Sequence, residues 1–217
     1  PLLGFFVFTI RGQVWAAIKS FYFYNLVDSQ TKFVGLKNFI TIFTKDVTYW
    51  ETWRNTIVFA LYKLPFEVPL ALLIALLLNK KLKATGVFRT IYYAPCVVSV
   101  AVVGVLFMGM FEHDGLINAY LTGCGLAKEP IDWFSNGFYA LTALVIGSVW
   151  QCIGTNILYF LGALQNVPEE LYEAAYLDGM SRVGMFFKIT LPLIAPVFQV
   201  ILLMAINGTL QTSDYIL

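Results

Sequence analysis

Long apolar runs dominate the chain and predict membrane-spanning helices. Three of these runs carry no charged side chain, 91–111, 138–164 and 191–213, and a fourth, 56–78, carries only two. Each run is long enough to match the roughly 20 residues that a helix needs to cross about 30 Å of hydrocarbon. The pattern therefore predicts helices that lie in a lipid bilayer rather than in water.

A further apolar run at the start is too short to span a membrane by itself. Residues 1–10 reach Arg11 after about 15 Å of helix, so we interpret this run as part of a span that begins before the first residue. The predicted fold is an all-α, polytopic transmembrane helix bundle that forms a single domain over 1–217. The expected spans lie near 1–24 (incomplete), 56–78, 88–111, 138–164 and 191–217.

Composition excludes the other broad classes of protein. The chain is 59% hydrophobic and 12% charged, against about 25% charged residues in soluble domains. Its net charge of +1 offers no electrostatic surface for nucleic acid, and three cysteines are too few for a disulfide scaffold.

The distribution of Lys and Arg indicates which loops face the cytoplasm. Loops 79–90 and 165–190 hold six of them together, against five in loops 25–55 and 112–137. Four of the six are concentrated in 79–90, which favours 79–90 and 165–190 as cytoplasmic.

Loop 165–192 carries the local signals of two short helices separated by a turn. Pro168 suits a first helical position, Gly179 suits a left-handed helix end, and Ser181 can cap a second helix before the last span. The helix either rests on lipid headgroups or docks to a protein. Four acids against two bases favour a protein partner.

The same loop resembles the EAA loop of bacterial ABC importer permeases. The resemblance rests on Glu173, Ala174 and Ala175, then Gly179 after three residues, then Ile189, Thr190, Leu191 and Pro192 after nine more. Other stretches are similar to carbohydrate-uptake permeases of the maltose, oligosaccharide and glycerol-phosphate type: FVGLKNF (33–39), FRTIYYAP (88–95), GLIN (115–118), IDW (131–133) and 162–179.

This resemblance implies a fold, a location and a set of partners. It implies a type I permease in the cell (plasma or inner) membrane, with a sixth span missing from this sequence. Loop 165–192 would be the coupling helix that seats in a cytosolic ATP-binding subunit, with Glu173 and Gly179 at the contact and the turn. The other implied partners are a second homologous permease subunit, an extracytoplasmic solute-binding protein, a small-molecule sugar and membrane lipid.

The sequence shows no chemistry of its own for an energy source. It holds no phosphate-binding Gly-Lys-Ser/Thr loop, and His113 stands alone without metal-ligand spacing. We therefore expect no enzyme activity, no metal and no cofactor, with ATP hydrolysed by a partner. The alternative is a secondary transporter or channel subunit without an ATPase. A membrane enzyme would have Lys63 and Glu67 as its candidate pair.

Polar side chains at helical spacing predict a substrate pathway through the last two spans. Polar groups in hydrocarbon are costly unless they face protein or a water-filled path. The candidates are Gln151, Thr155, Tyr159, Asn207, Gln211 and Asp214. The competing interpretation is hydrogen bonding between neighbouring helices, which we favour for Ser148 and for Thr155 taken alone. A neutral sugar is expected, because the spans hold no arginine cluster.

Lys63 and Glu67 lie one turn apart in the predicted span 56–78. They are either a wall of the cavity, or a gate contact to the partner permease, or an ion pair buried between helices, and we favour the buried pair. Pro65 and Pro69 predict a kink in this helix.

Overall fold

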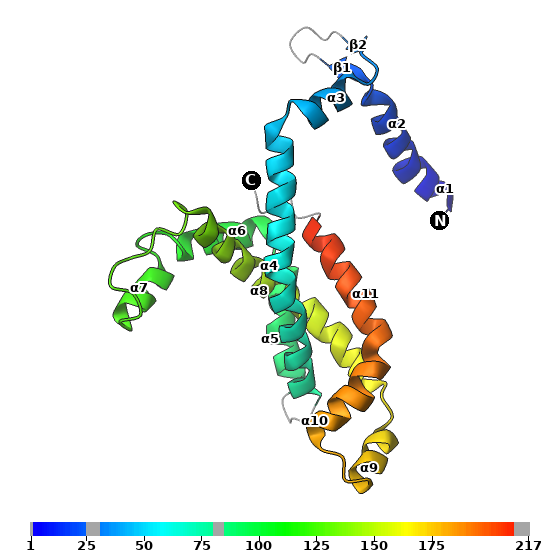
Figure 1. Cartoon of the computed structure of the whole chain (residues 1–217), viewed down its shortest axis with the longest axis vertical. Helices are drawn as coiled ribbons and strands as arrows, with labels where there is room; N and C mark the ends of the chain where they lie inside the picture. Colours follow the sequence, from blue (N-terminus) through cyan, green and yellow to red (C-terminus); the bar gives the residue numbers. More distant parts are fainter. Residues whose placement is uncertain (1, 25–30, 80–84, 211–217) are drawn as a thin grey trace. The chain divides into compact units, whose positions relative to one another are not determined.

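The computed structural model describes residues 2–24, 31–79 and 85–210 (Figure 1). The chain forms two compact units, Pro1–Asn55 and Thr56–Leu217, and each is described by itself. The expectation of a single domain stays a prediction. Lys80, Lys81 and Lys83, on which the charge argument for loop 79–90 depends, lie outside the described residues.

The first unit combines a helix with a small hairpin that the apolar pattern does not predict. The helix consists of α1 (Leu2–Phe5), a π-helical turn η1 (Phe6–Ile10) and α2 (Arg11–Lys19). Two antiparallel strands follow, β1 (Tyr22–Tyr24) and β2 (Thr31–Phe33), with Tyr22 opposite Phe33. The helical part of the expected first span 1–24 therefore ends at Lys19.

Asn38 fixes the turn that joins these elements to α3 (Lys37–Thr44). Its side-chain amide donates to the carbonyl oxygens of Ser20 at 2.8 Å and Tyr22 at 3.0 Å. Gly35 takes a φ of +55° between β2 and α3, which few other residues adopt without strain. The FVGLKNF stretch thus supplies both the turn and the side chain that holds it.

Helix α4 (Val47–Leu78) begins well before the predicted limit at residue 56. The carboxylate of Asp46 accepts from the backbone N–H of Tyr49 at 3.2 Å and so caps the first turn. The helix continues through Pro65 and Pro69 to Leu78.

The expected span 88–111 is wrong as a single helix. It is two helices, α5 (Thr85–Val97) and α6 (Val100–Met110), bent by 96° at the break between them (Figure 1). Pro95 lacks an N–H and weakens the helix just before the break, and Ser99 is extended with a ψ of 138°. An uninterrupted apolar run does not by itself predict such a bend, and Pro95 is the local signal for it.

Helix α8 (Gly137–Gln165) covers the run 138–164 that was predicted to be helical, and it is central to the second unit. The side chain of Asn136 accepts from the N–H of Phe138 and caps it. A Cβ at Gly154 would run into the backbone carbonyl of Tyr92 on α5, and one at Gly147 would lie 3.2 Å from the ring of Phe107 on α6. Glycines therefore set how closely α5 and α6 approach α8.

The second half of loop 165–192 differs from the prediction of a separate short helix. Helix α9 (Glu169–Leu177) is followed by α10 (Arg182–Met185), a π-helical turn η2 (Phe186–Thr190) and α11 (Leu191–Leu210). Residues Arg182–Leu210 form one uninterrupted helical stretch, so the last span begins at Arg182 rather than near 191. Pro192 does not start a new helix, because it lies where the π-helical turn runs on into α11. The end of the expected span, 211–217, lies outside the described residues.

Buried apolar side chains from three helices form the core of the second unit. In α4 they recur at three- and four-residue spacing, and they pack with residues of α8 and α11. The cluster includes Val68, Ala71, Leu72, Ala75, Ile157, Phe160, Leu161, Ile194 and Ile201. Within the described part of the chain, three helices are long and apolar enough to cross a membrane, or four if α5 and α6 count as one span; the expected five spans are not confirmed.

Candidate functional site

A polar cavity of about 300 Å³ lies in the second unit, among α4, α5, α6, α8 and α11. Its lining is Lys63, Glu67, Cys96, Val100, Gln151, Cys152, Thr155, Asn156, Tyr159, Met204, Ala205 and Gly208. All of these positions fall within predicted spans, so several of the polar groups that those spans contain lie together at this cavity.

The predicted stripe on α8 provides one wall of this cavity. Gln151, Thr155 and Tyr159 follow one another at four-residue spacing, and all three line the cavity. Thr155, for which helix-to-helix bonding was the favoured interpretation, thus lines the cavity with the other two. Asn156, which is not part of the predicted stripe, is also in the lining. An Asn inside an apolar span was the signal that could have found it.

Lys63 and Glu67 form a buried ion pair, as favoured from the sequence. The Lys63 Nζ lies 3.4 Å from the Glu67 Oε2, and the residues are 3% and 1% exposed. The Asn156 side-chain amide donates to the Glu67 Oε1 at 2.9 Å, which ties α4 to α8. The pair also lines the cavity, and its role as a wall of a transport path or as a gate contact stays a prediction.

Gln151 connects the cavity to the break between α5 and α6. Its side-chain amide donates to the carbonyl oxygen of Val98 at 2.9 Å. Val98 lies in the break, where carbonyls are released from the helical pattern, so Gln151 satisfies a group that would otherwise be costly in an apolar setting.

The predicted pathway residues of the last span are placed less completely. Asn207 is exposed on α11, and its neighbour Gly208 lines the cavity. Gln211 and Asp214 lie outside the described residues. A role for these three residues in the pathway stays a prediction.

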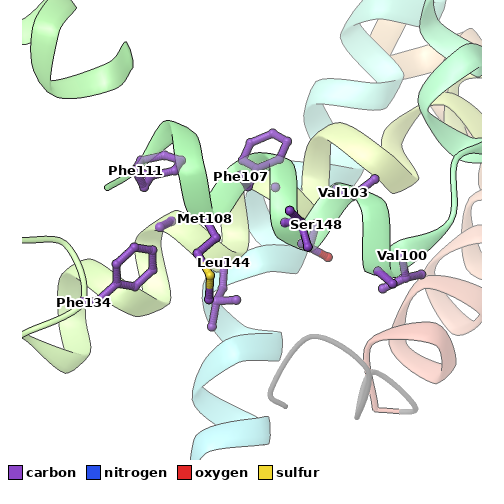
Figure 2. A pocket seen from close by; sticks show the side chains of 13 residues that line it. Val100, Val103, Phe107, Met108, Phe111, Phe134, Leu144 and Ser148 are labelled. Atoms are coloured by element: carbon purple, nitrogen blue, oxygen red, sulfur yellow. The ribbon is translucent and has the colours of Figure 1, made fainter. Parts of the chain in front are cut away.

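A second cavity, of about 320 Å³, lies between α6 and α8 and is lined mainly by apolar groups. Figure 2 shows the rings of Phe111 and Phe134 at one end of it and Val100 at the other. Ser148 belongs to this cavity, and among the described residues its buried hydroxyl has no hydrogen-bond partner. The expected bond from Ser148 to a neighbouring helix is therefore absent from the described part of the chain.

The predicted end of the first loop helix at Gly179 is confirmed in detail. Gly179 has a φ of +75°, its N–H donates to the Tyr176 carbonyl at 3.0 Å, and the Met180 N–H donates to the Ala175 carbonyl at 2.9 Å. This pair of bonds is the Schellman arrangement that ends helices at a glycine. Ser181 then caps α10 by accepting from the Gly184 N–H at 3.1 Å.

Helix α9 is held at its base and presents side chains outward. The Tyr172 hydroxyl lies 2.8 Å from the Thr190 hydroxyl, which joins α9 to η2. Ala175 is buried, whereas Tyr176 and Leu177 are 75% and 85% exposed. The remaining motif residues divide between exposed positions (Glu173, Ala174, Gly179, Pro192) and half-buried ones (Ile189, Leu191).

Asn118 organises loop 112–133, a role that the sequence alone did not reveal. Its amide donates to the carbonyls of Glu112, His113 and Ile131, and its oxygen accepts from the Ile131 N–H and the Trp133 ring N–H. The GLIN and IDW stretches are thus two halves of one hydrogen-bonded loop. Helix α7 (Leu116–Gly123) lies in this loop, and Gly125 follows its end with a φ of +71° and the same Schellman bonds as at Gly179.

Comparison with known protein families gives a match over most of the chain. Residues 67–216 match the family described as binding-protein-dependent transport system inner membrane component. The chain is 36% identical over 184 residues to the lactose transport system permease protein LacF of Rhizobium radiobacter, covering 84% of this chain and 61% of that protein. It is 38% identical over 197 residues to the probable ABC transporter permease protein YesP of Bacillus subtilis, covering 90% and 63%.

Comparison with solved structures supports the same fold. A bacterial ABC transporter involved in the import of the acidic polysaccharide alginate matches with a TM-score of 0.81 and 23% identity, over 98% of this chain and 71% of that chain. At this identity the likeness concerns the fold. The chain spans a little over three fifths of the length of the curated relatives named above.

Proposed function

Because the chain belongs to the family of binding-protein-dependent transport system inner membrane components, we propose that it acts within the permease subunit of an ATP-driven importer. The chain is a multi-pass protein of the cell membrane. Its substrate is a sugar or related polyol, which crosses by alternating access as the helices move around the polar cavity. Relatives named for lactose and for arabinooligosaccharides support this substrate class.

The observation that carries the proposal is the form of helix α9. A short helix that exposes Tyr176 and Leu177 almost fully, next to the acidic Glu173, has a surface suited to a groove in another protein. The hydroxyl contact from Tyr172 to Thr190 gives this helix a direct mechanical connection to the last span. A force applied to α9 by an ATPase would therefore reach α11.

Energy and delivery come from partners in this proposal. Cytosolic ATP-binding subunits hydrolyse ATP, a second homologous permease completes the pathway, and an extracytoplasmic binding protein supplies the substrate. One similar solved structure is a complex with a periplasmic protein bound to an alginate pentasaccharide, which supports the binding-protein partner. The chain itself is a transport component and not an enzyme.

The polar cavity is the place in this chain where a sugar would pass. Hydroxyl groups need both donors and acceptors, and the lining supplies amides at Gln151 and Asn156 and hydroxyls at Thr155 and Tyr159. The apolar cavity of Figure 2 offers few such groups. We therefore place the pathway at the polar cavity.

Two glycine substitutions test the coupling role. Gly179→Asp and Gly125→Asp each place a side chain at a left-handed backbone position that glycine occupies in a Schellman turn. The conformational strain costs about 1 kcal/mol in each case. Neither glycine has a neighbour within 4 Å of an added Cβ. Gly179 lies in the proposed coupling loop, and Gly125 lies in loop 112–137 on the proposed outer side.

Uptake of radiolabelled sugar and copurification of the ATP-binding subunits are measured for both variants. We expect Gly179→Asp to abolish uptake and release the ATP-binding subunits while the chain remains inserted, and Gly125→Asp to retain most of both. Normal uptake by Gly179→Asp would contradict ATPase docking at this loop. It would favour a transporter or channel that needs no ATPase.

A further inference from the structure

The proposed function does not require the buried ion pair between Lys63 and Glu67. Each charge loses its hydration when it is buried within a span, and the attraction between them repays this cost only in part. Uncharged polar groups could tie α4 to α8 at a lower cost. A role beyond holding the two helices together would account for the charges.

The geometry holds the pair at the wall of the polar cavity. Asn156 donates to one carboxylate oxygen of Glu67, and the Lys63 ammonium lies 3.4 Å from the other. The Lys63 Nζ also lies 5.8 Å from the centre of the Phe59 ring, within the range of a cation–π contact. Both side chains are thus held in one arrangement while they line the cavity.

The formal charge of the cavity lining is zero. Among the described residues that line it there is one basic side chain, Lys63, and one acidic side chain, Glu67, and their formal charges cancel. An uncharged polyol entering this space finds donors and acceptors on Gln151, Thr155 and Asn156. A carboxylated or phosphorylated ligand loses hydration of its own charge, and the attraction of Lys63 is offset by Glu67 only a few ångströms away.

We propose that the Lys63–Glu67 pair, oriented by Asn156, sets the charge selectivity of the cavity. With the pair intact, the cavity accepts uncharged polyhydroxylated ligands and discriminates against anionic ones. This inference rests on the proposed function, because it assigns a preference to the same pathway.

The test uses the complete transporter without its binding protein, so that the selectivity of that protein does not enter. The chain is purified in detergent with its partner permease and ATP-binding subunits. Saturation-transfer NMR then compares the affinities of methyl β-glucoside and methyl β-glucuronide, which differ by a hydroxymethyl and a carboxylate group. The wild-type complex is expected to prefer the glucoside.

Glu67→Gln removes the negative charge but keeps an oxygen that can accept from Asn156. The ratio of glucuronide to glucoside affinity is expected to rise about tenfold or more, because Lys63 is then uncompensated. Lys63→Gln is expected to lower the ratio, and it serves as the second variant where Glu67→Gln fails to assemble. The charge-swapped double variant Lys63→Glu/Glu67→Lys keeps a zero sum and is expected to keep the wild-type ratio.

The outcomes separate this inference from the proposed function. An unchanged ratio in both single variants, or a changed ratio in the charge-swapped variant, would overturn the role of the pair and leave the importer assignment standing. If the wild-type complex bound neither glycoside, the cavity would not be a sugar site, and the inference would fail with that part of the proposed function. Sugar uptake in the Gly179→Asp experiment is independent of both results.

Discussion

The close approach of α5 and α8 at Gly154 gives a stringent test of the packing around the polar cavity. A Cβ added at this position would overlap the backbone carbonyl of Tyr92 and lie 2.9 Å from the Cys96 sulfur. A backbone carbonyl inside a helix cannot rotate away as a side chain would. Gly154→Ala therefore requires α5 and α8 to move apart, even though it adds a single methyl group.

The expected cost follows from two opposing effects. Overpacking of a core typically costs about 1–3 kcal/mol, and the higher helix propensity of Ala returns up to about 1 kcal/mol. A net loss of about 1–2 kcal/mol corresponds to a fall in Tm of about 2–8 °C for a chain of this size. Displacement of Cys96 and Gln151 would also disturb the cavity lining, so uptake should fall more than stability alone explains.

Gly162→Ala is the matched control, because Gly162 lies in the same helix and has no atom within 4 Å of an added Cβ. Thermal unfolding of both variants is followed by tryptophan fluorescence in the same detergent. We expect Gly162→Ala to match or exceed the wild-type Tm. If Gly154→Ala unfolded at the same temperature as Gly162→Ala, the close contact between α5 and α8 would be refuted.

Three further substitutions test other contacts. Asn118→Ala removes a side chain with five hydrogen bonds and should cost more than about 3 kcal/mol locally, so loop 112–133 should become sensitive to limited proteolysis; a resistant loop would contradict its organising role. Tyr172→Phe removes the bond to Thr190, worth about 1 kcal/mol, and should weaken the coupling of ATP hydrolysis to uptake in proteoliposomes, whereas unchanged coupling would place the mechanical connection elsewhere. Asn38→Ala should lower the Tm by a few degrees, and an unaltered Tm would show that the turn does not depend on this side chain.

The sequence predicts most where one physical rule acts alone. The length and purity of the apolar run 138–164 required a helix, and α8 covers it with one residue to spare at each end. The turn at Gly179 was predictable because a left-handed helix end strongly favours glycine. The end of helix α9 could therefore be predicted from local signals, whereas the merging of α10 with the last span could not.

Prediction failed where apolar composition cannot distinguish a straight span from a bent one. The run 91–111 within α5 and α6 carries no charged side chain, yet the two helices meet at an angle of 96°. Pro95 weakens the helix there, and Gln151 satisfies the Val98 carbonyl from another helix. The second of these causes is a tertiary contact. It has no signature in the local sequence.

The candidate site was predicted in part for a similar reason. Helical spacing correctly grouped Gln151, Thr155 and Tyr159, since one helix presents all three. Their approach to Lys63 and Glu67 on α4, and the bond from Asn156, depend on how two helices pack against each other. Spacing within a single helix carries no information about that packing.

The most direct test of the account is whether helix α9 meets an ATPase in the cytosol. The native cysteines Cys96, Cys124 and Cys152 are first replaced by serine or alanine. Leu177→Cys then introduces a single thiol at an 85% exposed position, and this thiol is labelled with a photoactivatable crosslinker in membrane vesicles. Leu126→Cys, an exposed position in loop 112–137, is the control. We predict a crosslink from position 177 to the ATP-binding subunit and none from position 126. Crosslinking of position 177 to lipid alone, or its labelling from the outer face, would contradict the assignment of this chain as an ATP-driven permease.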